Sequence, residues 1–439
     1  DNARATLEEV YVSARKTVDN MQDVSISVTA FSGQTLDNLA IRDVREIEGL
    51  VPNLVIDSVS VAPGGASLYI RGVGTQEVER SFDPAVGVVV DGVPLSFVNG
   101  SMANTFDFSS LEVLRGPQGT LFGRNTTGGV INITRTRPTG EFGARVEGTY
   151  GTDDLADVKA VVNFPIVQDV LAGKVAYARQ TGGGQRKNTT IGEDVGDADN
   201  REMNLTLLFT PSDKFEALFT YVNYEDKNDG VVLQNLNSAN ENNPVNPDPE
   251  ALCDVPLNAI FPTACADGNV TDIENVTQDF YGQNINFEAD TYILNMQYDL
   301  GVGAVTTIIG YQETDESVPT DFDGTAVNFF HAIREQDAEQ TSIEIRFASS
   351  DELSETFDFV AGVFAVEDEY SLEQNTSIGA FGGPPFALFQ NSFADHEREA
   401  WAVFGEVHWN FTDALMLTVG GRYTEEEKDY AGEIFFGGG

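Results

Sequence analysis

The feature that most constrains the fold is a two-residue hydrophobic period, repeated through residues 141–439. In Met203–Thr210, for example, apolar Leu205 and Leu207 alternate with polar residues. This period is that of a β-strand with one apolar face. It predicts eleven strands, most of them about 10 residues or longer, against the five or six usual in soluble sheets. The predicted strands are 143–151, 155–164, 170–180, Met203–Thr210, Phe215–Glu225, Tyr292–Leu300, 304–313, Thr341–Phe347, 357–367, Trp401–Phe411 and Leu415–Tyr423.

The connections between these strands fall into two populations that alternate from the second strand onward. The short ones are 164–169, 211–214, 301–303, 349–355 and 412–414, and the long ones are 181–200, 227–290, 314–338 and 371–397. The first, 152–154, is the exception. A transmembrane barrel has short periplasmic turns and long extracellular loops, whereas a soluble sandwich has no reason to alternate. A soluble all-β adhesin or solenoid is the alternative.

Two further arguments define the membrane interpretation. No run approaches the ~18 apolar residues of a transmembrane helix. Eleven strands in lipid would leave two edges with unmade backbone hydrogen bonds, which is costly. We therefore expect the natural protein to be longer and residues 141–439 to form about half of a barrel.

The charge is distributed unevenly along the chain. The net charge is −45, and acidic residues outnumber basic ones 16 to 11 in residues 1–140 but 54 to 14 in residues 141–439. The stretch from 228 to 333 holds seventeen acids and no Lys or Arg. We expect these acids in the long connections, giving a negative outer surface. Such a chain repels phosphates, so nucleic acid is excluded as a partner.

Two cysteines, Cys253 and Cys265, lie in a stretch rich in Asn, Pro and Asp. A pair this close in a polar loop predicts a disulfide and an oxidising compartment. Two unrelated thiols are the alternative. The chain begins without a basic or apolar leader, which indicates that any signal peptide has been removed.

The first 140 residues contain a predicted helix at Asp43–Leu50 and a series of motifs in a fixed order. These are Glu8–Lys16 (EEVYVSARK), Asp23–Phe31, Tyr69–Gly74 (YIRGVG), Asp83–Gly87, Val89–Pro94 (VVDGVP), Leu111–Gly123 (LEVLRGPQGTLFG) and Gly128–Ile133. Together they resemble the plug domain of the TonB-dependent outer-membrane receptors, and they cover nearly all of this region.

The resemblance implies a mainly β protein of the Gram-negative outer membrane. Residues 1–16 would be the energy-coupling segment, 17–140 an α+β plug in the lumen, and 141–439 the N-terminal half of an antiparallel barrel. Complete barrels with a plugged lumen have about 22 strands. The inner-membrane TonB protein would pair with the coupling segment as an added strand, which needs no side-chain chemistry. Its contact residues would be Glu9, Val10, Tyr11, Val12, Ser13 and Ala14; an ordinary first strand is the alternative.

The plug motifs supply candidates for holding the plug in place: Arg71, Gly72, Asp91, Gly92, Glu112, Arg115, Gly116, Gly123 and Gly129. A buried guanidinium needs a carboxylate partner. We therefore expect Arg71, Arg115 and Glu112 to form a network with barrel acids such as Glu344 or Glu406. Solvated charges in a wet lumen are the alternative. The glycines indicate tight turns, since no Gly-Lys-Ser/Thr follows them.

Catalytic signals are missing from the sequence. The three histidines occur without a zinc motif, and no nucleophile motif is present. We expect no enzyme, no cofactor and no metal centre, although the abundant acids could bind Ca²⁺ or reflect a salty habitat.

The family imports scarce, bulky ligands, most often ferric siderophores, so the resemblance implies import of an iron–siderophore complex. An oligosaccharide or other neutral nutrient is the alternative, and a passive porin or structural protein is the alternative of another class. A negative mouth favours neutral or cationic ligands. Possible ligand contacts are Phe329, Phe330, Phe381, Phe386 and Phe389, although these rings could equally pack within their own loops.

Overall fold

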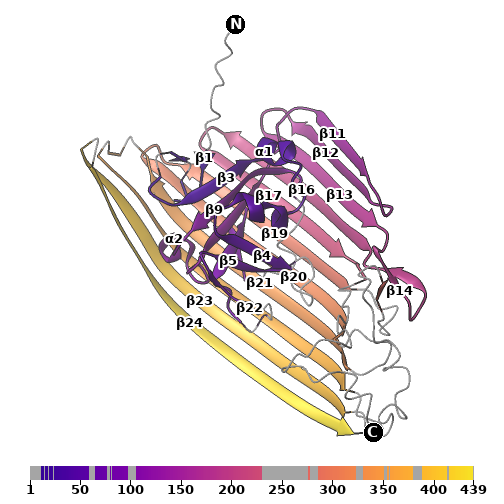
Figure 1. Ribbon diagram of the computed structural model, residues 1–439. Coiled ribbons are helices and arrows are strands. Elements are labelled where there is room, and N and C mark those ends of the chain that lie inside the picture. Colours follow the sequence, from indigo (N-terminus) through magenta and orange to yellow (C-terminus); the bar gives the residue numbers. More distant parts are fainter. Residues whose placement is uncertain are drawn as a thin grey trace, which may run out of the picture.

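The structure is a computed structural model, shown in Figure 1. It describes residues 11–438 except 14, 18, 23, 59–64, 77–79, 81, 97–104, 230–274, 277–284, 323–329, 351–352, 355, 379–387 and 413–414. Cys253 and Cys265 therefore lie outside the described residues, and their predicted disulfide stays a prediction.

One large antiparallel sheet of eleven strands forms the second part of the chain, and each strand pairs with its neighbour in sequence. The number of strands is as predicted. They are β11 (Gly143–Tyr150), β12 (Ala156–Val167), β13 (Leu171–Gly182), β16 (Ala198–Ser212), β17 (Phe215–Asp226), β19 (Asn286–Asp299), β20 (Gly303–Asp321), β21 (Phe330–Ser349), β22 (Phe357–Ile378), β23 (Leu388–Thr412) and β24 (Leu415–Gly438).

The long connections are shorter than we expected, and the alternation is clear only where 183–197 and 227–285 are the long ones. Further along, 322–329 and 379–387 are hardly longer than 350–356 between them. The connection expected at 314–338 spans only 322–329, and the one expected at 371–397 spans only 379–387. Strands β20 to β23 continue instead as a paired ladder. Their ends carry polar residues on both faces, so no hydrophobic alternation marks them, yet pairing satisfies their backbone groups.

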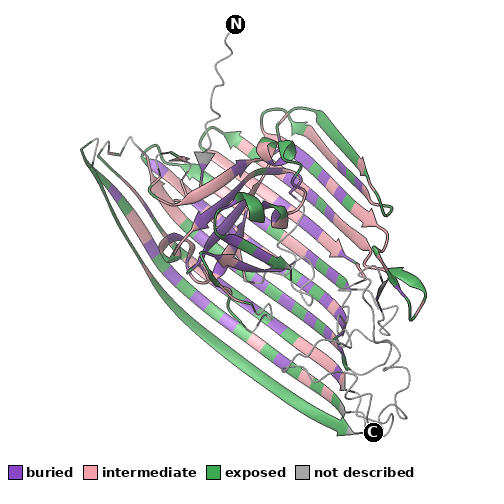
Figure 2. Ribbon diagram, in the orientation of Figure 1, coloured by how far each residue is buried: buried purple, intermediate pink, exposed green. Residues whose placement is uncertain are grey.

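We expected the acids in the long connections. Many of them lie instead on these strand extensions, which corrects that expectation. Side chains alternate between buried and exposed along the extensions of β20 to β23, whereas the edge strands β11 and β24 are exposed along almost their whole length (Figure 2). On the exposed, outward face Glu369 lies directly opposite Glu339 on one side and Glu397 on the other. The outward face of β21–β24 therefore carries rows of like charges.

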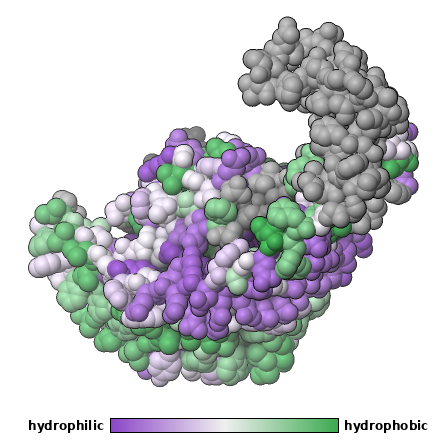
Figure 3. All heavy atoms as spheres, turned by 90° about the horizontal axis from the view of Figure 1, so that it is seen from below, coloured by the Kyte–Doolittle hydropathy of each residue, from purple (hydrophilic) through white to green (hydrophobic). Residues whose placement is uncertain are grey.

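Closer to the short connections, the outward face is apolar. Large hydrophobic side chains are exposed there: Ile345, Val363, Val403, Val407 and Trp409. Hydrophobic residues gather on the convex side of the sheet in Figure 3. An outward apolar band of this kind is what a lipid-facing barrel wall presents. Among the described residues, no helix has both the length and the apolar character needed to cross a bilayer.

The N-terminal domain lies against the inward face of the large sheet (Figure 1). Its main sheet has the order β3 (Val28–Ser32), β9 (Phe108–Arg115), β10 (Gly129–Arg135), β7 (Val86–Val90) and β8 (Val93–Leu95). Strands β10 and β7 are parallel, and the other pairs are antiparallel. A second sheet contains β4 (Leu54–Ser58), β5 (Ala66–Ile70) and β6 (Val73–Gly74). The two sheets enclose an apolar core that includes Ile70, Val88, Leu111 and Ile131.

Short helices complete this domain. A 3-10 helix spans Val44–Leu50, where we expected a helix, and Asp43 caps it by accepting a hydrogen bond from the Arg45 amide. Two further α-helices, α1 (Gly33–Asn38) and α2 (Gly119–Phe122), were not predicted. Two small sheets remain: β1 (Tyr11–Val12) pairs with β2 (Asp19–Asn20), and β14 (Arg186–Asn188) pairs with β15 (Glu193–Val195) and β18 (Asn275–Val276).

Candidate functional site

The predicted coupling segment is folded back under the plug. Tyr11 and Val12 form strand β1, and Val12 is almost fully buried against Val89, Leu114 and Val130 of the plug. Strand β1 lies near the end of the sheet that carries the short connections (Figure 1). Of the other predicted contact residues, Glu9, Val10 and Ala14 lie outside the described residues.

Ser13 is held by a buried carboxylate of the plug. The Ser13 amide donates to Glu112 Oε1 at 3.0 Å, and the Ser13 hydroxyl donates to the same oxygen at 3.1 Å. Asn132 Nδ2 donates to Ser13 Oγ at 2.8 Å. Burial raises the pKa of the Glu112 carboxyl, while the bonds from Ser13 and Asn132 act to lower it. Glu112 and Asn132 of the plug therefore form the binding site for Ser13.

Three residues later, Lys16 is held by the barrel wall. Its ammonium group pairs with Glu344 of β21 and lies 5.0 Å from the centre of the Phe404 ring. Glu344 also accepts from Arg346 at 2.7 Å. Burial lowers the pKa of Lys16 to about 8, against the opposing effect of Glu344. Residues 13–16 thus connect the plug with the wall.

Among the described residues, Arg71, Arg115 and Glu112 do not form the predicted network with the barrel acids. Glu112 binds Ser13, Glu344 binds Lys16, and Glu406 lies 3.0 Å from His408. Glu112 and Arg115 are three residues apart on β9, and an odd separation places side chains on opposite faces of a strand. Glu344 does bind a cation from the N-terminal region, but that cation is Lys16.

Arg71 and Arg115 instead both meet Ser27. Arg71 Nη2 donates to Ser27 Oγ at 3.2 Å, and the Arg115 amide donates to the Ser27 carbonyl at 2.9 Å. Gly72 and Gly116 follow these arginines with φ of +78° and +101°, a region that favours glycine. These motif residues therefore shape turns at the ends of β5 and β9.

Asp91 and Gly92 form the turn between β7 and β8. Asp91 accepts from Arg135 Nη1 and from the Arg135 amide, both at 2.8 Å, and Arg135 also reaches Glu202 of β16 at 3.9 Å. A Cβ on Gly92 would lie 2.6 Å from Ile308 of the wall. The turn therefore needs glycine for contact with the barrel.

Gly123 and Gly129 are also places of close approach. A Cβ on Gly123 would lie 2.9 Å from the Arg422 guanidinium, and one on Gly129 would lie 2.2 Å from the Leu114 carbonyl oxygen. Both glycines have positive φ. Their role in the structure is therefore close packing.

Two ionic contacts of the plug were not predicted from the sequence. Lys174 of β13 is fully buried, and its ammonium group donates to Asp107 at 2.5 Å and to Thr136 Oγ1 at 3.0 Å. Asp83 accepts from Arg124 and, at 2.7 Å, from Lys428 of β24. No sequence motif marks these pairs, because Lys174 and Lys428 meet their acids only when the plug lies against the wall, and Asp83 and Arg124 are 41 residues apart in the chain.

The predicted ligand contacts are only partly described. Phe330 is exposed and its ring centre lies 4.8 Å from that of Phe322, with the two rings tilted by 30°, and Phe389 is 46% exposed. Phe329, Phe381 and Phe386 lie outside the described residues. Of the two described rings, Phe330 on β21 and Phe389 on β23 are separated by strand β22.

One group of acids has metal-ligand spacing. Oxygen atoms of Glu367, Glu397 and Glu399 lie within 4.8 Å of one another on the exposed outward face. They belong to the rows of like charges described above, and exposed acids of this kind are common without an ion. The grouping therefore assigns no metal centre.

Comparison with known proteins identifies both parts of the chain. Residues 20–130 match the family model described as TonB-dependent Receptor Plug Domain, and residues 224–434 match the one described as TonB dependent receptor-like, beta-barrel. The pesticin receptor of Yersinia pestis is 31% identical over 191 residues, which are 43% of this chain and 28% of that relative.

Solved structures agree in fold. The ferric yersiniabactin uptake receptor FyuA from Yersinia pestis superposes with a TM-score of 0.73 at 19% identity, over 94% of this chain and 61% of that one. The ferripyoverdine receptor of Pseudomonas aeruginosa superposes with a TM-score of 0.71 at 14% identity, over 98% of this chain and 56% of that one. The chain thus spans less than two thirds of these relatives.

This family consists of receptors and transporters without enzymatic activity, as we expected from the missing catalytic motifs. Its members lie in the outer membrane, which agrees with the apolar outward band of the sheet. The chain belongs to the TonB-dependent receptors of the Gram-negative outer membrane, and it comprises a plug domain and part of the β-barrel.

Proposed function

We propose that this protein imports an iron–siderophore complex across the outer membrane, driven by TonB through the segment at residues 1–16. The observation that carries the proposal is the docking of Ser13 and Lys16 between plug and wall. A passive porin needs no plug and no such segment. We also keep, as part of the proposal, a plug at 17–140 and a half-barrel at 141–439.

The ligand class rests on the relatives and on the inward charges. FyuA is described as a ferric yersiniabactin uptake receptor, and the Pseudomonas aeruginosa receptor as bound to ferripyoverdine. Many of the acids that we expected at the mouth lie in rows on the outward face. On the inward face Arg398 and Lys428 pair with Asp368 and Glu426 of the wall and with Asp83 of the plug. The charges of this part of the inner wall offset one another, so it does not repel a negatively charged ferric complex as a purely acidic wall would, and the proposal extends beyond neutral and cationic ligands.

An oligosaccharide is the second candidate ligand. The neighbouring rings of Phe322 and Phe330 favour it, because aromatic rings can stack on sugars. Phe389 lies on the outward face of β23 together with Trp401, so it does not support this ligand. A panel of ferric siderophores and neutral oligosaccharides separates the two. Both tryptophans, Trp401 and Trp409, are exposed on the outward face, so calorimetry is a better readout than their fluorescence.

The decisive test is deletion of residues 7–14 from the complete receptor. Uptake of ⁵⁵Fe-labelled siderophore by energised cells should stop, while calorimetric binding to the purified receptor persists. Undiminished uptake would favour the porin. Binding of a glycan alone would make the protein a sugar importer.

A further inference from the structure

Residues that lie directly opposite one another on neighbouring strands form rows across the outward face of the large sheet. On β19–β23 one row is apolar and contains Leu294, Ile309, Ile343, Ala365 and Trp401. Two residues further from the short connections, the next row contains Tyr292, Tyr311, Thr341, Glu367, Glu399 and Glu427. The row after that is acidic throughout and contains Asp290, Glu313, Glu339, Glu369, Glu397 and Asp429. The outward face thus changes from apolar to acidic within two rows.

The tyrosines mark the level of the membrane surface. Tyr292 has Tyr221 of β17 on one side, with ring centres 4.9 Å apart, and Tyr311 on the other, at 6.1 Å. The Tyr221 hydroxyl donates to Asp290 at 2.7 Å, toward the acidic row. Tyrosine and tryptophan gather where acyl chains meet headgroups, because one end of the side chain is apolar and the other polar. With Trp401 in the row below, the acidic rows begin at headgroup level.

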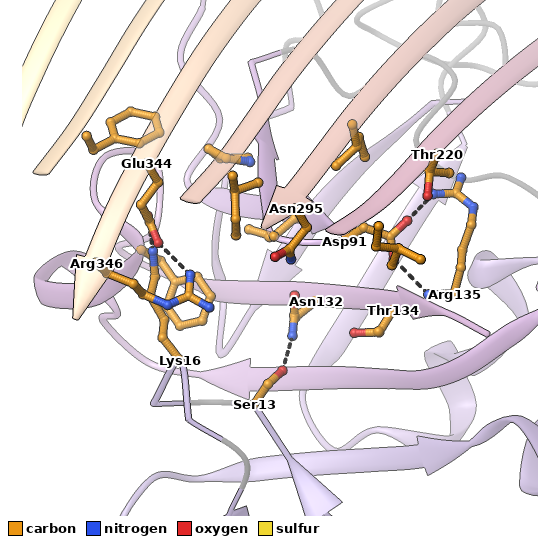
Figure 4. Close-up of a pocket in the computed structure, with 18 of the residues that line it drawn as sticks. Ser13, Lys16, Asp91, Asn132, Thr134, Arg135, Thr220, Asn295, Glu344 and Arg346 are labelled. Carbon is orange, nitrogen blue, oxygen red and sulfur yellow. Dashed lines mark hydrogen bonds and ion pairs between the residues drawn. The ribbon is translucent and has the colours of Figure 1, made fainter. Parts of the chain in front are cut away.

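The acids at this level have no cationic side chain of the same face beside them. The lysines and arginines of strands β19–β24 all lie on the inward face: Arg334, Arg346, Arg398, Arg422 and Lys428. Figure 4 shows Arg346 beside Glu344, together with Lys16 of the N-terminal region. Like charges directly opposite one another are destabilising. The outward rows therefore favour a cation from outside the chain.

A groove of about 650 Å³ crosses the border between the apolar and acidic rows on β21–β24. Its apolar part is lined by Ile343, Ala365 and Trp401, and its acidic part by Glu367, Glu399 and Glu427. Ala365 has the smallest side chain of its row. The groove is thus amphipathic, and its volume lies in the range of about 300–1,000 Å³ that is usual for small-molecule sites.

We propose that this groove binds a lipid whose headgroup carries a protonated amine. The ammonium group would pair with Glu367, Glu399 and Glu427, and the hydrocarbon chain would lie against Ile343, Ala365 and Trp401. An ammonium group bonds a carboxylate directly, whereas a phosphate headgroup is repelled by these rows unless divalent cations lie between. The groove continues the apolar band of the outward face, so a lipid reaches it from within the membrane.

Quenching of tryptophan fluorescence by brominated lipids tests this docking surface, because Trp401 lines the groove. The complete receptor is reconstituted in phosphatidylcholine vesicles. The signal of Trp401 is isolated, in each background, by subtracting the spectrum of the Trp401→Phe variant. The probes are a brominated alkylamine and brominated phosphatidylglycerol, each compared with brominated phosphatidylcholine.

Two triple variants with equal changes of charge are compared. The test variant carries Glu367→Gln, Glu399→Gln and Glu427→Gln. The matched control carries Glu335→Gln, Glu373→Gln and Glu433→Gln, which share one row of the same face. That row lies six residues further along each strand, roughly 20 Å from the groove. The control therefore lowers the charge of the face and leaves the groove intact.

The alkylamine should associate beside Trp401 about fivefold more strongly than phosphatidylcholine, as expected for an exposed ion pair. The test variant should lose this preference and the control should keep it. Equal association of alkylamine and phosphatidylcholine with the wild type overturns the proposal. An equal loss in both variants also overturns it, because the net charge of the face would then attract the amine.

A third result would assign the surface to another lipid. If phosphatidylglycerol is preferred in the presence of Ca²⁺ and the alkylamine is not, phosphate bridged by the cation is the occupant and the amine proposal is wrong. Since no uptake is measured, all of these outcomes are independent of the deletion test of the proposed function.

Discussion

Acidic side chains are paired with cations on the inward face of the barrel wall but lie opposite one another on its outward face. On the inward face, Glu344 meets Lys16, and Lys174 meets Asp107 of the plug. On the outward face of the strand extensions, Glu369 lies between Glu339 and Glu397, with like charges directly opposed. A buried charge must be paired, whereas an exposed one is hydrated and screened by salt. The same acidic composition therefore fixes the plug on one face and leaves a repulsive surface on the other.

The largest effect should come from breaking a buried pair on the inward face. Lys174→Met leaves Asp107 buried without its cation, which typically costs about 3–5 kcal/mol. We expect the plug to become sensitive to protease in the folded receptor, and its unfolding in urea to shift accordingly. Lys174→Met combined with Asp107→Asn should recover much of the loss. A single variant as resistant as the wild type would contradict the pairing.

An intermediate effect should appear in the pH dependence of segment docking. The hydrogen bonds from Ser13 lower the pKa of Glu112, so the docked segment favours the ionised carboxylate. Burial raises this pKa above its usual value, and docking should therefore weaken as pH falls through that raised value. A spin label at Thr17→Cys, with both native cysteines replaced by serine, should become more mobile on acidification.

Glu112→Gln removes the titrating group and provides the control. Mobility of the label in this variant should no longer change over the same pH range. An unchanged pH response would show that another group controls docking.

The smallest effect should come from the outward face. Replacing Glu369 by Gln removes repulsion from Glu339 and Glu397, and cross-strand pairs contribute about 0.2–1 kcal/mol. We expect a slight stabilisation in urea at low salt that disappears at about 1 M NaCl, where the Debye length is about 3 Å. Ser371→Ala, on the same strand and face, should show no such salt dependence. A gain that persists at high salt would exclude charge repulsion as its cause.

The strand extensions show where the sequence pattern stops being informative. The apolar alternation of Ile343 and Ile345 marks the part of β21 that faces lipid, and it was sufficient to predict the strand. The same strand begins at Phe330, where polar residues occupy both faces. Backbone pairing with β20 and β22 continues the strand there. The sequence of one strand does not show which strands it pairs with, so this part could not be predicted.

The candidate site divides in the same way. The motifs around Glu112 and Arg115 were recognisable in sequence, but their partners were not. From the sequence we expected Glu112 and Arg115, three residues apart, to belong to one network. On a strand, an odd separation places their side chains on opposite faces. The helix at 44–50 was predictable because Val44, Ile47 and Leu50 recur at helical spacing, and the structure shows that Asp43 caps it.

The sequence by itself determined the period of two, the eleven strands and the family motifs, because all of these depend on residues near one another in the chain. The tertiary structure decided which charges meet. Ser13 and Glu112 are 99 residues apart, Lys174 and Asp107 are 67 apart, and Lys16 and Glu344 are 328 apart. Burial within the lumen makes these pairings necessary, and only the placement of the plug against the wall selects the partners.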